Sequence, residues 1–393
     1  MKDYTQIYSI IETIDKMINH MEKQQLDIVV LSDILKTCKI VNQELYKSCI
    51  LKFQRDYDLK SKEGYANFVD EIKKLKDIWK TSVDNRIKNP LDEEFWEIYD
   101  YFKLVDDKVI YEKVLNYFWS LPETYQQEFL SIPTRYTFLT GKIDVIEQDF
   151  SLINQYVKMM SREIEKYKWL YEMLADYRSK RILNGIIKYW FQFNIDELHR
   201  YTENVFLDYF DLDILQCGKE DIFVDLGAYT GDSITDYITT YGNYKKIYAY
   251  EITPGTYQKL INNLNIYSDI VFNQKGVGKS HGSMYIDVKI NDAGNKVSDN
   301  GINKVEVVCL DEDILEPISV VKMDIEGAEK EAIEGMKKHI QNEKPKLLIS
   351  TYHIPADIFE IPYMLFKIRN DYKFYLRFNG RGIWPCDYIL FAV

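Results

Sequence analysis

Hydrophobic residues in the first half of the chain recur at the three- and four-residue spacing of an amphipathic helix. The pattern predicts six helices, over residues 7–21, 28–45, 68–79, 93–118, 146–176 and 178–191. Long helices avoid glycine, and only three of the 17 glycines fall in residues 1–212. We therefore expect an all-helical N-terminal domain over 1–212.

After about residue 215 the pattern changes, because short apolar runs alternate with amphipathic stretches. Apolar runs at 221–227 and 246–253 flank a helical stretch, GDSITDYITTYG. Six further strands are predicted in DIVFNQKGVG, VEVVCL, SVVKMDI, KPKLLISTYH, YKFYLRF and DYILFAV. This alternation predicts an α/β domain over 213–393 with a mainly parallel sheet. Such sheets bind ligands at the carboxyl ends of their strands, near the point where strand order reverses.

Composition narrows the class of protein. With 50 Lys and Arg against 62 Asp and Glu, the net charge is −12, which disfavours non-specific binding to nucleic acid or to an anionic membrane. Five scattered cysteines without a C-x-x-C pair indicate neither a disulfide framework nor a zinc site. The N-terminus does not resemble a signal peptide, and no apolar run is long enough to span a membrane. We expect a cytoplasmic protein with no nucleic-acid partner and no membrane insertion.

The first candidate site is the glycine-rich turn Asp225-Leu226-Gly227-Ala228-Tyr229-Thr230-Gly231, after the first strand. Glycines there let the backbone bend sharply beside the N–H groups that open the next helix. The spacing D-x-G-x-x-x-G differs from the dinucleotide fingerprint, and an ordinary strand-to-helix turn is the alternative. Glu251 ends the second strand, where a carboxylate can accept both hydroxyl groups of a ribose. Together the two features favour a ligand site.

The next candidates follow later strands. Asp324 and Glu326 lie in a strand-to-helix turn. Glu329 is expected in the first turn of the helix, where the helix dipole stabilises a carboxylate. Carboxylates suit a hard cation, but no histidine is adjacent in this segment, so we expect no metal. His353 follows the next apolar strand and is a candidate general base, with a structural histidine as the alternative. The other four histidines are expected at the surface.

The segments DLGAYTGDS, YEITP, KGVG, LDE, VKMDIEGAE and STYHIPADIFEIP occur in this order. In this respect residues 215–393 resemble methyltransferases of the FkbM family, and DIEGAE followed by YHIPADIFEIP carries most of the resemblance. LADYRSKRILNGIIKYW (174–190) is similar to the helical lead-in of longer members. The resemblance implies a class I (Rossmann-like) methyltransferase sheet of seven strands, with S-adenosylmethionine (SAM) across its carboxyl edge.

The resemblance also implies roles for individual residues. The methionine part of SAM would lie at the first turn, the ribose at the second strand, the adenine after the third strand, and the sulfonium and acceptor at the fourth. The cofactor residues are, in that order, Asp225, Gly227, Ala228 and Gly231, then Glu251, then Asn273 and Val277, then Asp324. The catalytic residues are His353, Asp324 and Glu326. One departure is Leu376-Arg377-Phe378-Asn379, where the family has a basic-aromatic run with histidine, so an acceptor contact at Phe378 is not implied.

These features predict a SAM-dependent methyltransferase that acts on an oxygen of a sugar, a glycan or a small secondary metabolite. N-methylation of an amino-acid or amino-sugar group on a glycan is one alternative. A catalytically inactive SAM-binding scaffold is another. The helical N-terminal domain would serve as a lid, as an acceptor-docking platform or as the surface of a homo-oligomer.

Overall fold

The computed structural model describes residues 89–135, 139, 141–193, 195–286 and 303–393. The described residues divide into two compact units, one formed by 89–116 with 160–164 and the other by 117–159 with 165–393. The helices expected over 7–21, 28–45 and 68–79 lie outside the described residues. A functional boundary at residue 212 stays a prediction.

Helices account for most of the described residues before 200. They are α5 (Pro90–Leu104), α6 (Asp107–Ser120), α7 (Glu123–Arg135), α8 (Ser151–Met173), α9 (Tyr177–Gln192) and α10 (Asp196–His199). The single helix expected over 93–118 is two helices, because the backbone adopts an extended conformation at Val105 and ends the first helix. The helix expected over 178–191 is confirmed as α9, which begins where the Asp176 side chain accepts a hydrogen bond from the Ser179 amide.

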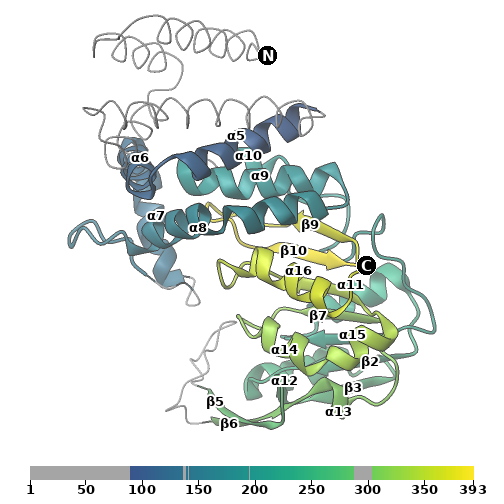
Figure 1. Cartoon of the computed structure of the whole chain (residues 1–393). Helices are drawn as coiled ribbons and strands as arrows, with labels where there is room; N and C mark the ends of the chain where they lie inside the picture. Colours follow the sequence, from purple (N-terminus) through teal and green to yellow (C-terminus); the bar gives the residue numbers. More distant parts are fainter. Residues whose placement is uncertain (1–88, 136–138, 140, 194, 287–302) are drawn as a thin grey trace, which may run out of the picture. The chain divides into compact units, whose positions relative to one another are not determined.

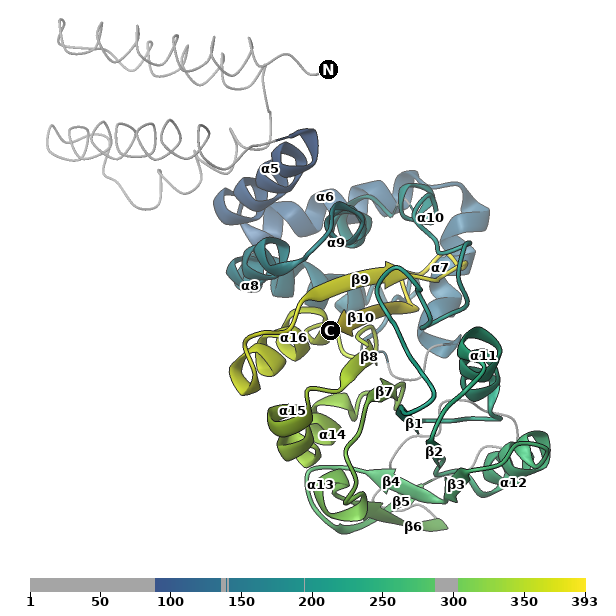
Figure 2. The ribbon, with the colours of Figure 1, turned by 90° about the vertical axis from the view of Figure 1, so that its right-hand side faces the viewer.

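The α/β region holds a seven-stranded sheet in the order β3-β2-β1-β7-β8-β10-β9 (Figures 1 and 2). Its strands are β1 (Ile222–Leu226), β2 (Lys246–Tyr250), β3 (Ile270–Asn273), β7 (Val320–Met323), β8 (Lys346–Ser350), β9 (Phe374–Phe378) and β10 (Tyr388–Ala392). The first five are parallel, and β10 runs antiparallel to both of its neighbours. This confirms the Rossmann-like α/β sheet. The strand order reverses between β1 and β7, so their carboxyl ends flank the switch point.

Helices cover both faces of this sheet (Figure 2). They are α11 (Asp232–Tyr241), α12 (Pro254–Leu264), α14 (Glu329–Gly335), α15 (Lys337–Glu343) and α16 (Asp357–Ile368). On one face Phe223 and Ile247 pack with Tyr237 of α11 and Leu264 of α12 in a fully buried core. Alternate residues of each strand point to opposite faces, so runs that are buried throughout, such as β1, serve both helix layers.

A smaller sheet in the order β4-β6-β5 follows β3 in the chain. It consists of β4 (Lys275–Val277), β5 (Gly282–Ile286) and β6 (Asn303–Val308), and the short helix α13 (Leu310–Asp313) comes next. The run DIVFNQKGVG, expected as one strand, is therefore split between two sheets as β3 and β4. The strand β5 was not predicted.

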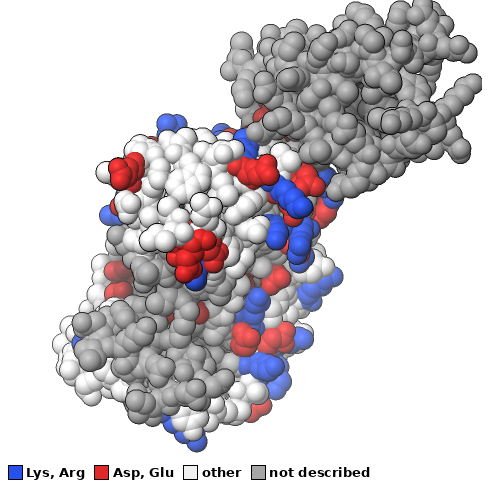
Figure 3. All heavy atoms as spheres, turned by 90° about the vertical axis from the view of Figure 1, so that its left-hand side faces the viewer, with Lys and Arg blue, Asp and Glu red and all other residues white. Residues whose placement is uncertain are grey.

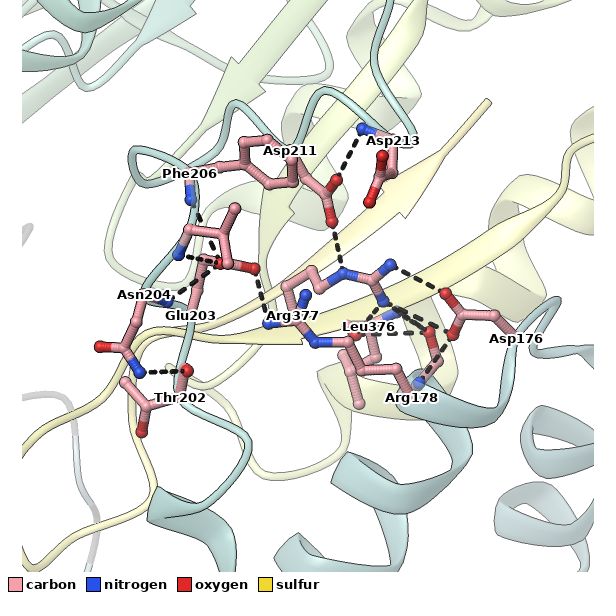
Figure 4. A network of polar contacts seen from close by, with 12 residues as sticks. Asp176, Arg178, Thr202, Glu203, Asn204, Phe206, Asp211, Asp213, Leu376 and Arg377 are labelled. Atoms are coloured by element: carbon pink, nitrogen blue, oxygen red, sulfur yellow. Dashed lines mark hydrogen bonds and ion pairs between the residues drawn. The ribbon is translucent and has the colours of Figure 1, made fainter.

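A buried ionic network joins the segment before β1 to the edge strand β9 (Figure 4). Arg377 of β9 donates from Nε to Asp211 at 2.6 Å and from Nη2 to Asp176 at 2.8 Å. Ser179 adds a further contact between the two segments, since its hydroxyl accepts a hydrogen bond from the Leu376 amide at 2.8 Å. Phe378, in the run that departs from the family pattern, is fully buried, and its carbonyl accepts a hydrogen bond from the Glu203 amide. This run therefore contributes to the same network.

Two surface features bear on the sequence predictions. Within the described residues no helix has both the length and the apolar character needed to cross a bilayer. On the face drawn in Figure 3, lysines and arginines lie interspersed with acidic side chains. His339 was expected at the surface, and that prediction is wrong. Its side chain is buried, with Nδ1 2.6 Å from the Glu343 carboxylate and Nε2 3.0 Å from the backbone carbonyl of Ile314.

Candidate active site at the carboxyl edge of the sheet

The turn between β1 and α11 requires glycine at two positions. Gly227 has φ +78°, and a Cβ there would lie 2.0 Å from the backbone oxygen of Asp324. Gly231 has φ +90°, and a Cβ there would lie 2.8 Å from Leu264. The glycines thus let β1 approach β7 and let α11 approach α12. The Ala228 side chain is buried in the core, so only its backbone faces the sheet edge.

Asp225 lies at the end of β1 and is completely buried. Its carboxylate is 3.1 Å from Nζ of Lys322 and accepts a hydrogen bond from Ser233. Burial raises the pKa of Asp225, and Lys322 and Ser233 offset part of that effect. Lys322 also donates to the carbonyl of Gly227 at 2.8 Å, so the pair fixes the glycine-rich turn. Direct contact of Asp225 with a cofactor stays a prediction.

Glu251 follows β2 and has both carboxylate oxygens fixed by backbone amides. Oε2 accepts from Tyr229 at 3.1 Å and Oε1 accepts from Thr253 at 2.7 Å. Burial raises its pKa, and these hydrogen bonds oppose the rise. Asn273 lies beside it, since its carbonyl accepts from the Glu251 amide. The side-chain amide nitrogen of Asn273 is buried without a hydrogen-bond partner, which leaves a donor on the residue that is predicted to approach the adenine. Val277 lies in β4 of the smaller sheet, and its expected contact with adenine is untested.

Asp324 follows β7 and contacts two tyrosines and His353 at the carboxyl edge of the sheet. Its Oδ2 accepts from the Tyr209 hydroxyl at 3.0 Å, and its Oδ1 accepts from Tyr352 at 3.3 Å. The Tyr209 hydroxyl is also 3.0 Å from the hydroxyl of Ser350, at the end of β8. Burial alone would raise the pKa of Asp324, but Lys322, His353 and Tyr209 together lower it. Asp324 is therefore held as a carboxylate.

His353 is brought next to the acids by the pairing of β7 with β8. Its side chain is 1% exposed, and Nε2 lies 3.3 Å from Asp324 Oδ1 and 3.8 Å from Glu326 Oε2. Its Nδ1 is 3.0 Å from Oε1 of Glu329. Burial lowers the pKa of His353, but the hydrogen bond to Glu329 and the surrounding carboxylates outweigh burial and raise it to about 9. Glu326 adopts a left-handed φ of +57°, so the turn itself is strained.

Asp324, Glu329 and His353 offer ligand-type atoms within 4.8 Å of one another. The argument against a metal assumed that no histidine lies beside these acids, and that assumption is wrong. The spacing would admit a cation, while the protonated imidazole already supplies positive charge among the carboxylates.

The structure thus brings together all three predicted catalytic residues, His353, Asp324 and Glu326. It places Glu251 near the first turn through the amide of Tyr229. Tyr209 was missed, because nothing in the pattern before β1 marks it. Lys322 and Glu329 stand in the segment that sequence analysis singled out, yet their contacts across the sheet were not foreseen.

Comparison with known proteins places this edge in a family. Residues 225–374 match the family model of the methyltransferase FkbM domain. The chain contains an FkbM methyltransferase domain. The FkbM domain includes the turn after β1, Glu251, the cluster around Asp324, and His353, whereas Tyr209 and Arg377 lie outside the matched range. No curated protein matches the chain.

A crystal structure of a methyltransferase FkbM from Methylobacillus flagellatus KT is similar, with 25% identity and a TM-score of 0.53 over 61% of this chain. The match spans 62% of that protein's length. An rRNA methylase from Streptococcus thermophilus matches 44% of this chain at 17% identity, with a TM-score of 0.29. Fibrillarin from Aeropyrum pernix, solved with natively bound SAM, matches 45% at 12% identity, with a TM-score of 0.28.

Proposed function

We propose that the protein is a SAM-dependent methyltransferase that methylates a hydroxyl group of a sugar, a glycan or a small secondary metabolite in the cytoplasm. The observation that carries the proposal is the meeting of the Gly227 turn, Glu251 and Asp324 at the switch point of an FkbM domain. The match supports methyl transfer as the reaction. The acceptor class is our inference.

The edge residues fit SAM in charge and in hydrogen bonding. Each carboxylate oxygen of Glu251 accepts a hydrogen bond from one backbone amide. Each keeps a lone pair that can accept a hydrogen bond from a ribose hydroxyl. Asn273 has a buried amide nitrogen without a partner, which suits an acceptor atom of a base. Asp324 and Glu326 would face the positive end of the cofactor. The bound cofactor would supply an electrophilic methyl group on a sulfonium.

The chain's own part in the reaction is alignment and proton transfer. Asp324, held by Tyr209 and Tyr352, fixes the electrostatics of the edge. His353 would take the proton from the acceptor hydroxyl. Because Glu329 and the other carboxylates raise the pKa of His353 to about 9, His353 must first give up the proton that it holds at neutral pH. A positive charge bound beside Asp324 would lower the pKa of His353 and favour that loss.

N-methylation of an amine is the second candidate. Its support is the excess of acid, since three carboxylates surround one imidazole, and a cationic amine would be attracted to Asp324 and Glu326. A homo-oligomer formed through residues 1–212 is a further proposal.

Calorimetry with SAM and with its demethylated product tests the cofactor. We expect Glu251→Ala to weaken SAM binding by about tenfold or more, since it removes two or more hydrogen bonds of about 1 kcal/mol each. Glu220→Ala, an exposed acid before β1, serves as the matched control and should bind like the wild type. Absence of SAM binding by the wild type, or an unchanged affinity of Glu251→Ala, would overturn the assignment.

Labelled SAM and cell extracts would then identify the acceptor. We expect His353→Ala to keep its SAM affinity and to lose turnover, whereas full turnover would remove His353 from the reaction. SAM binding without a labelled product in any extract would favour an inactive scaffold.

A further inference from the structure

Glu329 has no assigned role in the proton transfer proposed above, although it contacts the imidazole that would accept the proton. We propose that Glu329 is a positioning residue that fixes the ring and the tautomer of His353, so that Nε2 is the nitrogen that accepts the substrate proton. This inference rests on the proposed function, because it assigns the proton-accepting atom of the same site.

Glu329 is held in place from two sides. It is the first residue of α14, it is 0% exposed, and its Oε1 accepts from the Ile325 amide at 3.1 Å. The same oxygen lies 3.0 Å from Nδ1 of His353, on the following strand's loop. The helix dipole alone would offset little of the desolvation of a fully buried carboxylate. The burial of Glu329 against the imidazole indicates a different purpose.

The two ring nitrogens of His353 have unequal environments. Nδ1 faces the fully buried Glu329 at 3.0 Å, whereas Nε2 faces Asp324 at 3.3 Å, and the Asp324 side chain is 29% exposed. Hydrogen bonds to a carboxylate are stronger when they are shorter and shielded from water. The neutral ring should therefore keep its proton on Nδ1, and the proton that leaves is the one on Nε2.

Nε2 points toward Asp324 and Glu326, which is the side of the ring where the acceptor is expected. If SAM is bound, the acceptor oxygen would bond to the methyl carbon that the cofactor supplies, and the carbon–sulfur bond would break with its electron pair going to sulfur. The acceptor proton moves to Nε2 and gives an imidazolium between Glu329 and Asp324. This arrangement matches the general role of a buried carboxylate that orients a catalytic histidine.

The tautomer can be measured on the full-length protein without any acceptor. Nitrogen-15 NMR of protein labelled at its five histidines, with His353→Gln to identify the signal, reports which ring nitrogen carries the proton. Above the pKa of His353 we expect the Nδ1–H form in the wild type and a loss of that preference in Glu329→Gln. An Nε2–H form in the wild type, or an unchanged preference in Glu329→Gln, would overturn the proposal.

A kinetic test uses labelled SAM and the extract fraction that accepts methyl groups. Glu329→Gln should lower kcat by about 100-fold while KM for SAM changes little, because the base is misdirected and the cofactor residues are intact. Glu329→Asp, which keeps the charge, should recover part of kcat. Glu331→Gln, an exposed acid of the same helix, is the matched control. A folded Glu329→Gln variant with a kcat within threefold of wild type contradicts the inference.

The two proposals can fail separately. Loss of SAM binding by the wild type overturns the proposed function, whatever the tautomer of His353. An Nε2–H tautomer in a protein that binds SAM overturns only the role of Glu329.

Discussion

Two buried ionic clusters in the same compact unit differ in their balance of charge. Around Arg377 the guanidinium faces Asp176 and Asp211, and Arg178 pairs with Glu203 close by (Figure 4). Around His353 one imidazole lies among three carboxylates, two of which are partly exposed at the sheet edge. The first cluster is close to neutral and joins segments of the chain. The second keeps an excess of negative charge beside solvent, which is the condition for binding a cationic ligand.

Breaking the Arg377 cluster should have the largest effect on stability. Arg377→Met leaves the buried Asp211 without its cation and the partly exposed Asp176 without its partner, so we expect a loss of about 3–5 kcal/mol in the free energy of unfolding. Urea denaturation measures it. Arg369→Met, which removes a solvent-exposed pair with Asp371, is the control and should cost far less stability than Arg377→Met. Equal losses for the two variants would show that burial does not distinguish the Arg377 cluster.

The His353 cluster should instead make stability depend on pH. The pKa of His353 rises from 6.5 to about 9 on folding, so the folded protein binds this proton more tightly than the unfolded chain does. The resulting stability, on the order of 3 kcal/mol, is present in full below pH 6.5 and is lost as pH rises through 9. Melting temperatures between pH 6 and 10 measure it. His353→Gln should flatten that dependence, and a wild-type profile as flat as that of the variant would contradict the raised pKa.

Gly227 offers a test of the edge that involves no charge. Gly227→Ala should cost about 2–3 kcal/mol, because its left-handed φ is unfavourable for alanine and the new methyl group meets the backbone of Asp324. Gly242→Ala has a similar φ of +77° but open space around it, so it should cost only about 1 kcal/mol. Thermal unfolding of the two variants isolates the contact between β1 and β7. Matching losses would mean that this contact adds nothing.

Tyr209→Phe should have the smallest effect on stability. It removes the hydroxyl between Asp324 and Ser350, and we expect a loss of about 1 kcal/mol. Tyr244→Phe removes an exposed hydroxyl that donates to the Ser268 carbonyl, and it should cost less. Urea midpoints compare them. A larger loss for Tyr244→Phe would argue against a structural role of the Tyr209 hydroxyl.

Much of the fold followed from sequence because the relevant signals are local. Buried strands such as Ile222–Leu226 and Lys346–Ser350 are short apolar runs, and the turn after β1 carries its glycines. That His353 meets Asp324 also follows from topology, since β7 and β8 are parallel neighbours and their carboxyl ends share an edge. The expectation of no histidine beside the acids failed because it considered the sequence segment alone.

The remaining contacts depend on distant segments that no local pattern marks. Tyr209 reaches Asp324 across 115 positions, and Arg377 reaches Asp176 across 201. Glu329 lies in a first helical turn where an acid is common, so its burial is visible only once His353 is in place. His339 was misjudged for the same reason, because its polar sequence neighbours do not show which side of α15 is covered.

The position of β10 has a consequence for how the molecule assembles. This strand lies between β8 and β9, so β9 is connected to the sheet only through β10, and Asp211 meets its partner Arg377 only on β9. Contacts that close the longest stretches of chain form slowly, because their loop entropy must be offset first. We therefore expect Tyr209 to reach Asp324 late in folding, so that the protein acquires a finished active site only when its most distant parts have already met.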